Sequence, residues 1–335
     1  MARVRFVPYF VLALILGTIL LSASRTLAQS PSIINKGSAG PAQIALDMPS
    51  GRASPRTVAV RMSVDLVLIP VTVTDALNHP QTNLTRSDFK IYEGDRPEEI
   101  RYFSQEDSPI SVGLLLDVSK SMQDKIDTER AAVDQFFRNA NPQDDYFVIT
   151  FNGRPRVLSD VTQSTNGIET ELGLVEPSGA TALLDAVYLG ISKLHNAKYS
   201  RRALVIISDG GDNSSRYKFR EIKSIAAESD VMLYAIGIFD SAPFKSFEET
   251  MGRRWLSAMT DVTGGRTSTI KSTAKLPEQC ALLSRELRSQ YLLGYEPRDR
   301  KSDGKWHKIK VVVSGSSESG QLHSYYRKGY FTPNP

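Results

Sequence analysis

The sequence predicts an α/β fold, a doubly wound and mostly parallel sheet with helices on both faces, flanked by a small β-rich module. Continuous apolar runs such as SVGLLLD (111–117) and ALVIIS (203–208) are typical of strands buried on both faces of a parallel sheet. Segments with apolar residues at helical spacing separate these runs. β-branched and aromatic runs broken by turn residues precede and follow the α/β region, and these predict the module.

The strand–helix alternation extends over residues 107–289, which we assign to one domain. Its strands are expected at 111–117, 144–151, 203–208 and 231–238, and its helices at 126–138, 182–194, 221–229, 255–263 and 276–288. Residues 240–254 are expected to form an insertion. It selects partners if it lies beside the binding edge of the sheet, and otherwise it is a surface loop.

The β-rich module is expected to combine residues 58–106 with residues 290–335. The expected strands are 58–61, 64–74, 89–92, 99–103, 290–295, 306–313 and 324–331. Pro70 indicates an edge strand or a bulge within the longest run. The charged turn at 298–305, closed by Asp303-Gly304, predicts a hairpin between its flanking strands. Neither half has enough strands for its own core, so we expect the two halves to pack together.

The first residues have the pattern of an export signal. Arg3 and Arg5 precede an apolar run over residues 6–21, and small residues lead to an expected cleavage after Ala28. Because the run is long for a signal, the alternative is an uncleaved anchor. We therefore expect an exported protein, periplasmic or secreted, with membrane contact only through this segment. Residues 29–57, rich in Ser, Pro, Ala and Gly, predict a flexible linker.

Composition excludes several classes of protein. The chain has 335 residues, 41% of them hydrophobic and 23% charged, which is ordinary for a globular protein. Three arginines within residues 1–28 account for most of the net charge of +4, so the remainder offers no electrostatic basis for binding nucleic acid. The single cysteine, Cys280, excludes an internal disulfide framework and a cysteine-rich zinc site.

Oxygen-bearing side chains cluster where the expected strands end and the helices begin. They are Asp117, Ser119, Ser121, Thr181 and Asp209. Ligands of open α/β sheets bind outside the carboxyl ends of the strands. Donors that are all oxygens favour a hard cation, Mg²⁺ first and Mn²⁺ or Ca²⁺ as alternatives.

Four of these five residues also have a purely structural interpretation. The two serines and Thr181 stand before helices and could serve as N-caps. Asp209-Gly210 on its own is a turn, and nearby Asp212 is interpreted as a turn residue rather than a ligand. The order of the residues along the chain, each at the appropriate end of a strand or helix, favours the site.

In this order the residues match the pattern D-x-S-x-S…T…D. Residues 107–289 thus resemble a von Willebrand factor type A (VWFA) domain, a Rossmann-like fold, and the five residues resemble its metal ion-dependent adhesion site. The flanks YEGDRPEEIRYFS (92–104) and LRSQYLLGYEP (287–297) resemble a bacterial family of exported proteins related to that domain.

The resemblance implies a role for each residue. Ser119, Ser121 and Thr181 would bind a divalent cation directly or through water, and Asp117 and Asp209 would hold it through water or by contact. Because the hydroxyls are neutral, the ion would keep an open position for an Asp or Glu carboxylate of a protein partner. Lys120 stands between the two serines, where a small residue is common in the family. It would either favour an acidic partner or weaken metal binding.

We therefore expect an exported, non-enzymatic binding protein. The alternatives are an envelope scaffold that its metal only stabilises, and a metal-dependent hydrolase. A hydrolase needs a general base, and His195, at the end of the helix 182–194, is expected to lie far from the metal and to interact with the helix dipole. Cys280 lies in an apolar stretch and reads as a buried core residue rather than a nucleophile.

Overall fold

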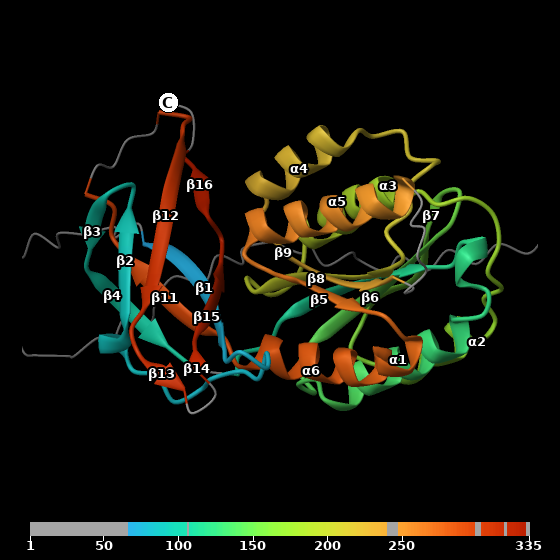
Figure 1. The fold of residues 1–335 in the computed structure, drawn as a ribbon, viewed down its shortest axis with the longest axis horizontal. Coiled ribbons are helices and arrows are strands. Elements are labelled where there is room, and N and C mark those ends of the chain that lie inside the picture. Colours follow the sequence, from blue (N-terminus) through green and yellow to red (C-terminus); the bar gives the residue numbers. More distant parts are fainter. Residues whose placement is uncertain (1–65, 106, 240–246, 299–302, 318–319, 333–335) are drawn as a thin grey trace, which may run out of the picture. The chain divides into compact units, whose positions relative to one another are not determined.

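The computed structural model describes residues 66–105, 107–239, 247–298, 303–317 and 320–332. The predicted signal peptide, the predicted linker and the predicted strand at 58–61 lie outside these residues. The described part of the chain combines one α/β domain with two antiparallel sheets (Figure 1).

The α/β domain contains a six-stranded sheet with the order β10-β9-β8-β5-β6-β7. Its strands are β5 (Ser111–Asp117), β6 (Asp145–Phe151), β7 (Pro155–Thr162), β8 (Arg202–Ser208), β9 (Met232–Ile238) and β10 (Thr267–Ile270). All pairs are parallel except β6–β7. Every residue of β5, β6 and β9 is buried, as their apolar sequences require. The predicted fold class is confirmed.

Helices cover both faces of this sheet (Figure 1). One face carries α1 (Ile126–Arg138), α2 (Thr165–Gly173) and α6 (Leu276–Arg288). The other carries α3 (Leu183–His195), α4 (Phe219–Glu228) and α5 (Phe247–Thr263). Short 3₁₀ helices in the described ranges lie at Arg86–Asp88, Lys120–Met122 and Thr273–Lys275. Among the described helices, none has the length and apolar character that crossing a membrane requires.

Three elements of the domain were not predicted. The edge strand β7 alternates irregularly between exposed and half-buried residues, α2 buries only Ile168 and Leu172, and β10 has four residues. Their apolar patterns are therefore too weak to read from the sequence. Residues 240–246 of the predicted insertion at 240–254 lie outside the described residues. The remainder of the prediction is wrong, because α5 already begins at Phe247.

The module consists of two four-stranded sheets around one core. The first has the order β15-β1-β11-β4, with β1 (Val67–Thr74), β4 (Ile100–Ser104), β11 (Tyr291–Tyr295) and β15 (His323–Tyr326). The second has the order β16-β12-β2-β3, with β2 (Phe89–Glu93), β3 (Arg96–Glu98), β12 (Trp306–Val313) and β16 (Gly329–Phe331). A small ladder joins β13 (Ser316–Ser317) and β14 (Gly320–Gln321). N- and C-terminal segments thus share both sheets, as predicted.

The strand connections of the module differ from the prediction. β11 and β12 belong to different sheets and form no hairpin, and the run 324–331 divides into β15 and β16, also in different sheets. β1 is not an edge strand. However, β15 pairs with it only from Val71 onward, so Pro70 has a neighbour, β11, on one side only. Its missing N–H group is therefore tolerated there.

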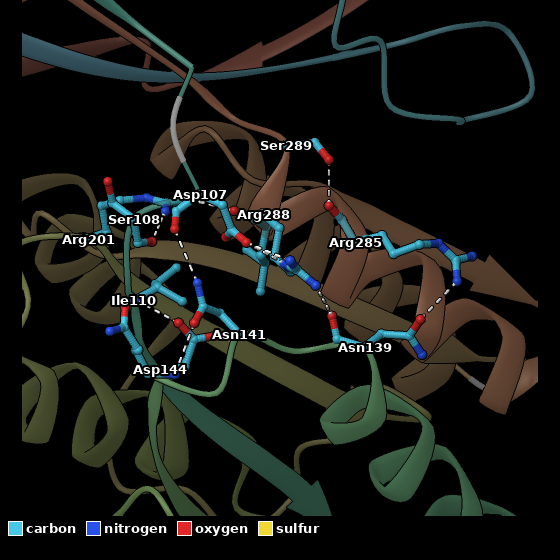
Figure 2. A network of polar contacts seen from close by, with 12 residues as sticks. Asp107, Ser108, Ile110, Asn139, Asn141, Asp144, Arg201, Arg285, Arg288 and Ser289 are labelled. Carbon is cyan, nitrogen blue, oxygen red and sulfur yellow. Dashed lines mark hydrogen bonds and ion pairs between the residues drawn. The ribbon is translucent and has the colours of Figure 1, made fainter.

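Two connections join the α/β domain to the module, and a polar network holds them together (Figure 2). The guanidinium of Arg288, at the end of α6, donates to Asp107 Oδ2 at 2.7 Å. Asn141 Nδ2 donates to the carbonyl of Asp107 at 3.1 Å. Arg201 donates to the carbonyl of Ser108 in the first connection and to that of Leu287 in the last turn of α6. The α/β domain therefore starts and ends at one place, as a domain inserted into the module.

Candidate metal centre

Asp117 lies at the carboxyl end of β5 and is fully buried. Its Oδ1 accepts the backbone N–H of Ser119 at 3.0 Å. The Ser119 and Ser121 hydroxyl oxygens are 3.1 Å apart and hydrogen-bonded to each other. Although Ser119 precedes the 3₁₀ turn Lys120–Met122, its side chain makes no capping hydrogen bond. The capping interpretation therefore does not account for Ser119.

Asp209 follows β8, the neighbour of β5 in the sheet. Ser208 ties the two strand ends together: its Oγ donates to Asp117 Oδ2 at 2.6 Å and accepts the Gly210 N–H at 2.9 Å. The left-handed backbone of Gly210, with φ of 83°, turns the chain directly after Asp209. The two carboxylates are thus close enough for the charge of Asp209 to act on Asp117.

Helix α5 packs tightly onto this turn. A Cβ atom on Gly252 would lie 1.7 Å from the carbonyl oxygen of Gly210, so only glycine permits the approach. The contact between α5 and this turn therefore fixes the position of Asp209.

Thr181 brings a third loop to the same place. Its backbone N–H donates to Asn213 Oδ1 at 2.9 Å, and its side chain is buried. A Cβ atom built on Gly211 would lie 3.6 Å from Asp209 Oδ1 and 3.9 Å from Thr181 Oγ1, so both oxygens border the space at Gly211. We call residues 117–122, 178–182 and 208–213 together the rim loops.

The first turn of α3 is capped by residues other than Thr181. Asp212 Oδ2 accepts the N–H of Leu184 at 2.8 Å, and Ser215 Oγ accepts that of Asp185 at 3.1 Å. Asp212 is thus occupied with capping, in agreement with its interpretation as a structural residue. The Thr181 hydroxyl makes no hydrogen bond to any residue that the structure describes, and it is available for an ion.

The two carboxylates of the rim loops lie in different electrostatic surroundings. Burial, together with the charge on Asp209, raises the pKa of Asp117 to about 6. Lys125, directly before α1, places its Nζ 3.8 Å from Asp209 Oδ2. Their side chains are only 15% and 18% exposed, respectively. Lys120 is exposed, so the lysine that opposes a cation most directly is Lys125, which the sequence did not single out.

A buried carboxyl group of α1 was also missed. Glu129 is fully buried, and neither of its carboxyl oxygens has a partner among the described residues. Burial, and secondly the charge on Asp117, raise its pKa well above the ordinary value. Both effects favour the neutral form of the Glu129 carboxyl group. Glu129 stands three residues after Ile126 and four before Val133, both on the buried face of α1, so its helical spacing could have placed it there.

The donor set of the rim loops fits a hard divalent cation. It consists of two carboxylates and three hydroxyls, all oxygen ligands. No cluster of three or more His, Cys, Asp or Glu side chains suited to a metal occurs in the described part of the chain. His195, the only histidine of the α/β domain, is the exposed last residue of α3, whose first turn adjoins Thr181. It is thus a full helix length from the rim loops.

A second polar cluster lies in the module. His307 Nδ1 is 2.8 Å from Glu93 Oε1, and its Nε2 is 3.4 Å from Asp303 Oδ1. The hydroxyl of Tyr295 donates to Glu93 Oε2 at 2.6 Å, and the ring of Tyr330 stacks on the imidazole. The hydrogen bond to Glu93 is the main cause that raises the pKa of His307 above 6.5. Because the two ring nitrogens face different carboxylates, the cluster resembles an ion-pair network more than a metal site.

A helix-covered, mostly parallel sheet with polar side chains at the carboxyl ends of its central strands defines a class of α/β domains that bind ligands at this edge. Residues 112–211 match the family model of the von Willebrand factor type A domain. This part of the chain is therefore similar to that domain, and the predicted resemblance is confirmed. Both halves of the module lie outside the matched residues, and no curated protein matches the chain.

Several solved structures are similar to parts of this chain. The protein BatB from Bacteroides thetaiotaomicron is 15% identical, with a TM-score of 0.43 over 54% of this chain and 100% of that chain. An aerotolerance-related membrane protein from Bacteroides fragilis is 15% identical, with a TM-score of 0.43 over 53% of this chain and 98% of that one. A von Willebrand factor type A protein from Catenulispora acidiphila is 12% identical, with a TM-score of 0.46 over 81% and 75%.

Proposed function

We propose that this protein is an exported, non-enzymatic binding protein that grips an acidic residue of a protein partner through a divalent cation. Mg²⁺ is the preferred ion, with Mn²⁺ or Ca²⁺ as alternatives. A von Willebrand factor type A domain supports a role in protein interaction, and the metal, the partner and export are the parts we add.

One observation carries the proposal. The rim loops gather hydroxyl and carboxylate oxygens, while other side chains cap the helix that begins there. Asp212 and Ser215 cap α3, which leaves the hydroxyl of Thr181 without a partner among the described residues. An oxygen cluster not needed for capping is available to an ion.

Each residue then has a defined task. A bound cation supplies positive charge and an open coordination position for a carboxylate. The Ser119 N–H and the Ser208 hydroxyl donate hydrogen bonds to Asp117, so its carboxylate is already oriented before an ion binds. Ser119 and Thr181 provide neutral oxygens, which leave the ion enough net charge to attract an acidic partner.

The first test is thermal unfolding with EDTA and with millimolar Mg²⁺, Mn²⁺ or Ca²⁺. An ion at about 100 times its dissociation constant stabilises the folded state by roughly 2.7 kcal/mol. For a domain of this size the midpoint should rise by roughly 5–10 °C. Asp209→Asn should abolish the rise. The matched control Asp212→Asn removes an acid from the same loop and should lower the midpoint but keep the metal-induced rise.

The outcomes separate the proposal from a structural scaffold. A midpoint that no cation changes, in the native chain and in both variants, contradicts a metal site. If the cation raises the midpoint but EDTA leaves the capture of carboxylate-bearing peptides unchanged, the metal only stabilises the fold. Loss of capture in EDTA, and also in Asp209→Asn, supports the metal-dependent grip.

A further inference from the structure

A cleft of about 590 Å³ opens beside the rim loops, between β7 and the segment that joins α2 to α3. Its near end is formed by Val118 and Ser178, both within the rim loops. The Ser178 N–H donates to the Val118 carbonyl at 2.9 Å, and Val118 lies between Asp117 and Ser119. The cleft therefore adjoins the proposed metal centre, and a chain that places a carboxylate there can extend into it.

Two arginines form the strand side of the cleft. Arg154 and Arg156 are exposed, and neither forms an ion pair with any residue that the structure describes. Arg154 directly precedes β7 and Arg156 is its second residue. Arg156 lies opposite Thr150 of β6, which also lines the cleft. Two unpaired guanidinium groups at one wall offer fork-shaped donors that suit a carboxylate.

An apolar side chain stands on the opposite side. Leu174 is 81% exposed, the highest value of any large hydrophobic residue in the described ranges. The turn that carries it is anchored, because Arg130 donates to the carbonyls of Leu172 at 3.2 Å and Val175 at 2.8 Å. Leu174 is therefore exposed on an anchored turn beside the rim loops, where it can pack against an apolar side chain of a partner.

The same side of the cleft also carries two acids. Glu171 and Glu176 line it, and neither is ion-paired within the described part of the chain. They repel a partner that is acidic throughout. A second carboxylate of the partner is therefore favoured only on the strand side, next to Arg154 and Arg156.

We propose, on the basis of the proposed function, that this cleft selects the partner segment next to the metal-bound acid. The segment presents an apolar side chain to Leu174 and a second acidic residue to Arg154 and Arg156. The partner is thus an extended protein segment with two acidic residues a few positions apart and an apolar residue between them.

The test uses the mature chain and synthetic peptides labelled with a fluorophore, in buffer with millimolar Mg²⁺. One series carries two Asp residues separated by one to four positions, with a Leu between them, on a Gly-Ser background. The control peptide has the same composition, but its second Asp is moved to the far end. At the correct spacing the affinity should exceed that of the control roughly tenfold, as expected for one charge-assisted hydrogen-bonded contact.

Variants assign this preference to the cleft. Arg154→Glu combined with Arg156→Glu should remove the preference, and Leu174→Ser should weaken binding of the Leu-containing peptides several-fold. The matched control, Glu171→Lys with Glu176→Lys, reverses charges in the same cleft and should retain or increase the preference. A Mg²⁺ titration of each variant should give unchanged metal affinity, which shows that the rim loops are intact.

Three outcomes decide the matter. Equal affinity at every spacing overturns the inference, and so does a preference that survives reversal of both arginines. In either case, binding that EDTA still abolishes would leave the proposed function standing. If EDTA changes the binding of no peptide, the proposed function fails and the inference fails with it.

Discussion

Replacement of Lys125 by methionine is expected to strengthen metal binding. The Lys125 ammonium lies 3.8 Å from Asp209 Oδ2, where it neutralises a predicted ligand and repels an incoming cation. Methionine has a similar length and no charge, so it removes both effects with little change in packing. The same variant should unfold at a lower temperature in EDTA, because Asp209 then lacks a counter-charge.

The size of the effect follows from the geometry. At this separation two unit charges interact by about 4 kcal/mol at an effective dielectric constant of 20 and by about 1 kcal/mol in water. Both side chains are mostly buried but retain some exposure, 15% for Lys125 and 18% for Asp209, so we expect a value between these limits. About 2 kcal/mol corresponds to a roughly thirty-fold increase in metal affinity.

Calorimetric titration with Mg²⁺ measures this change directly. Lys120→Met is the matched control, because Lys120 is exposed and its charge is screened by solvent. Its effect should be only a few-fold. Unchanged or weaker metal binding by Lys125→Met, or a larger effect from Lys120→Met, would refute the assignment of Lys125 as the competing cation.

Other predictions concern stability. Glu129→Leu should raise the free energy of unfolding in urea by about 1–3 kcal/mol, because it removes a buried carboxyl group that lacks partners among the described residues; a loss of stability would contradict this. Gly252→Ala should lower it by about 2–3 kcal/mol and weaken metal binding, since its Cβ would meet the Gly210 carbonyl. Gly167→Ala in α2, where a Cβ meets nothing within 4 Å, should be neutral or stabilising, and equal losses in both would argue against the contact. The raised pKa of His307 means that its contribution to stability is present below pH 6.5 and lost as pH rises through the folded pKa; His307→Gln should flatten this dependence in urea titrations, and an unaltered profile would exclude His307 as its source.

The central strands were predictable because burial on both faces leaves them no polar residues. The predicted ends of β5 and β9, for example, lie within one residue of the observed ends. β7 was not predictable, because none of its residues is buried and its register against β6 shifts twice, so exposed and half-buried residues do not alternate regularly. The division of the predicted strand 324–331 into β15 and β16 was missed for a different reason. Only Arg327 and Lys328 separate the two short strands, so they look like one run until it is known that they belong to different sheets.

The candidate site was predictable as far as strand order determines it. Asp117 and Asp209 follow parallel strands, and parallel strands end at the same edge of a sheet. Glu129 could have been found, because its spacing to Ile126 and Val133 places it on the apolar face of the predicted helix. Lys125 could not, because it precedes the helix and its contact with Asp209 joins two loops that are far apart in the sequence. Both residues come close to the predicted ligand residues Asp117 and Asp209 only in the folded domain. The ligand roles themselves remain predictions.

The insertion of the α/β domain into the module has a consequence for the order of folding. β1 to β4 are synthesised before the whole α/β domain, and their partners β11, β12, β15 and β16 come after it. Until then the apolar sides of the early strands lack half of their core. Closing such a long loop by diffusion would be entropically unfavourable. Once the α/β domain has folded, Arg288 and Asp107 lie in contact, so the late strands start next to the early ones. The α/β domain thus acts as the template on which the module is completed, and the module should form last.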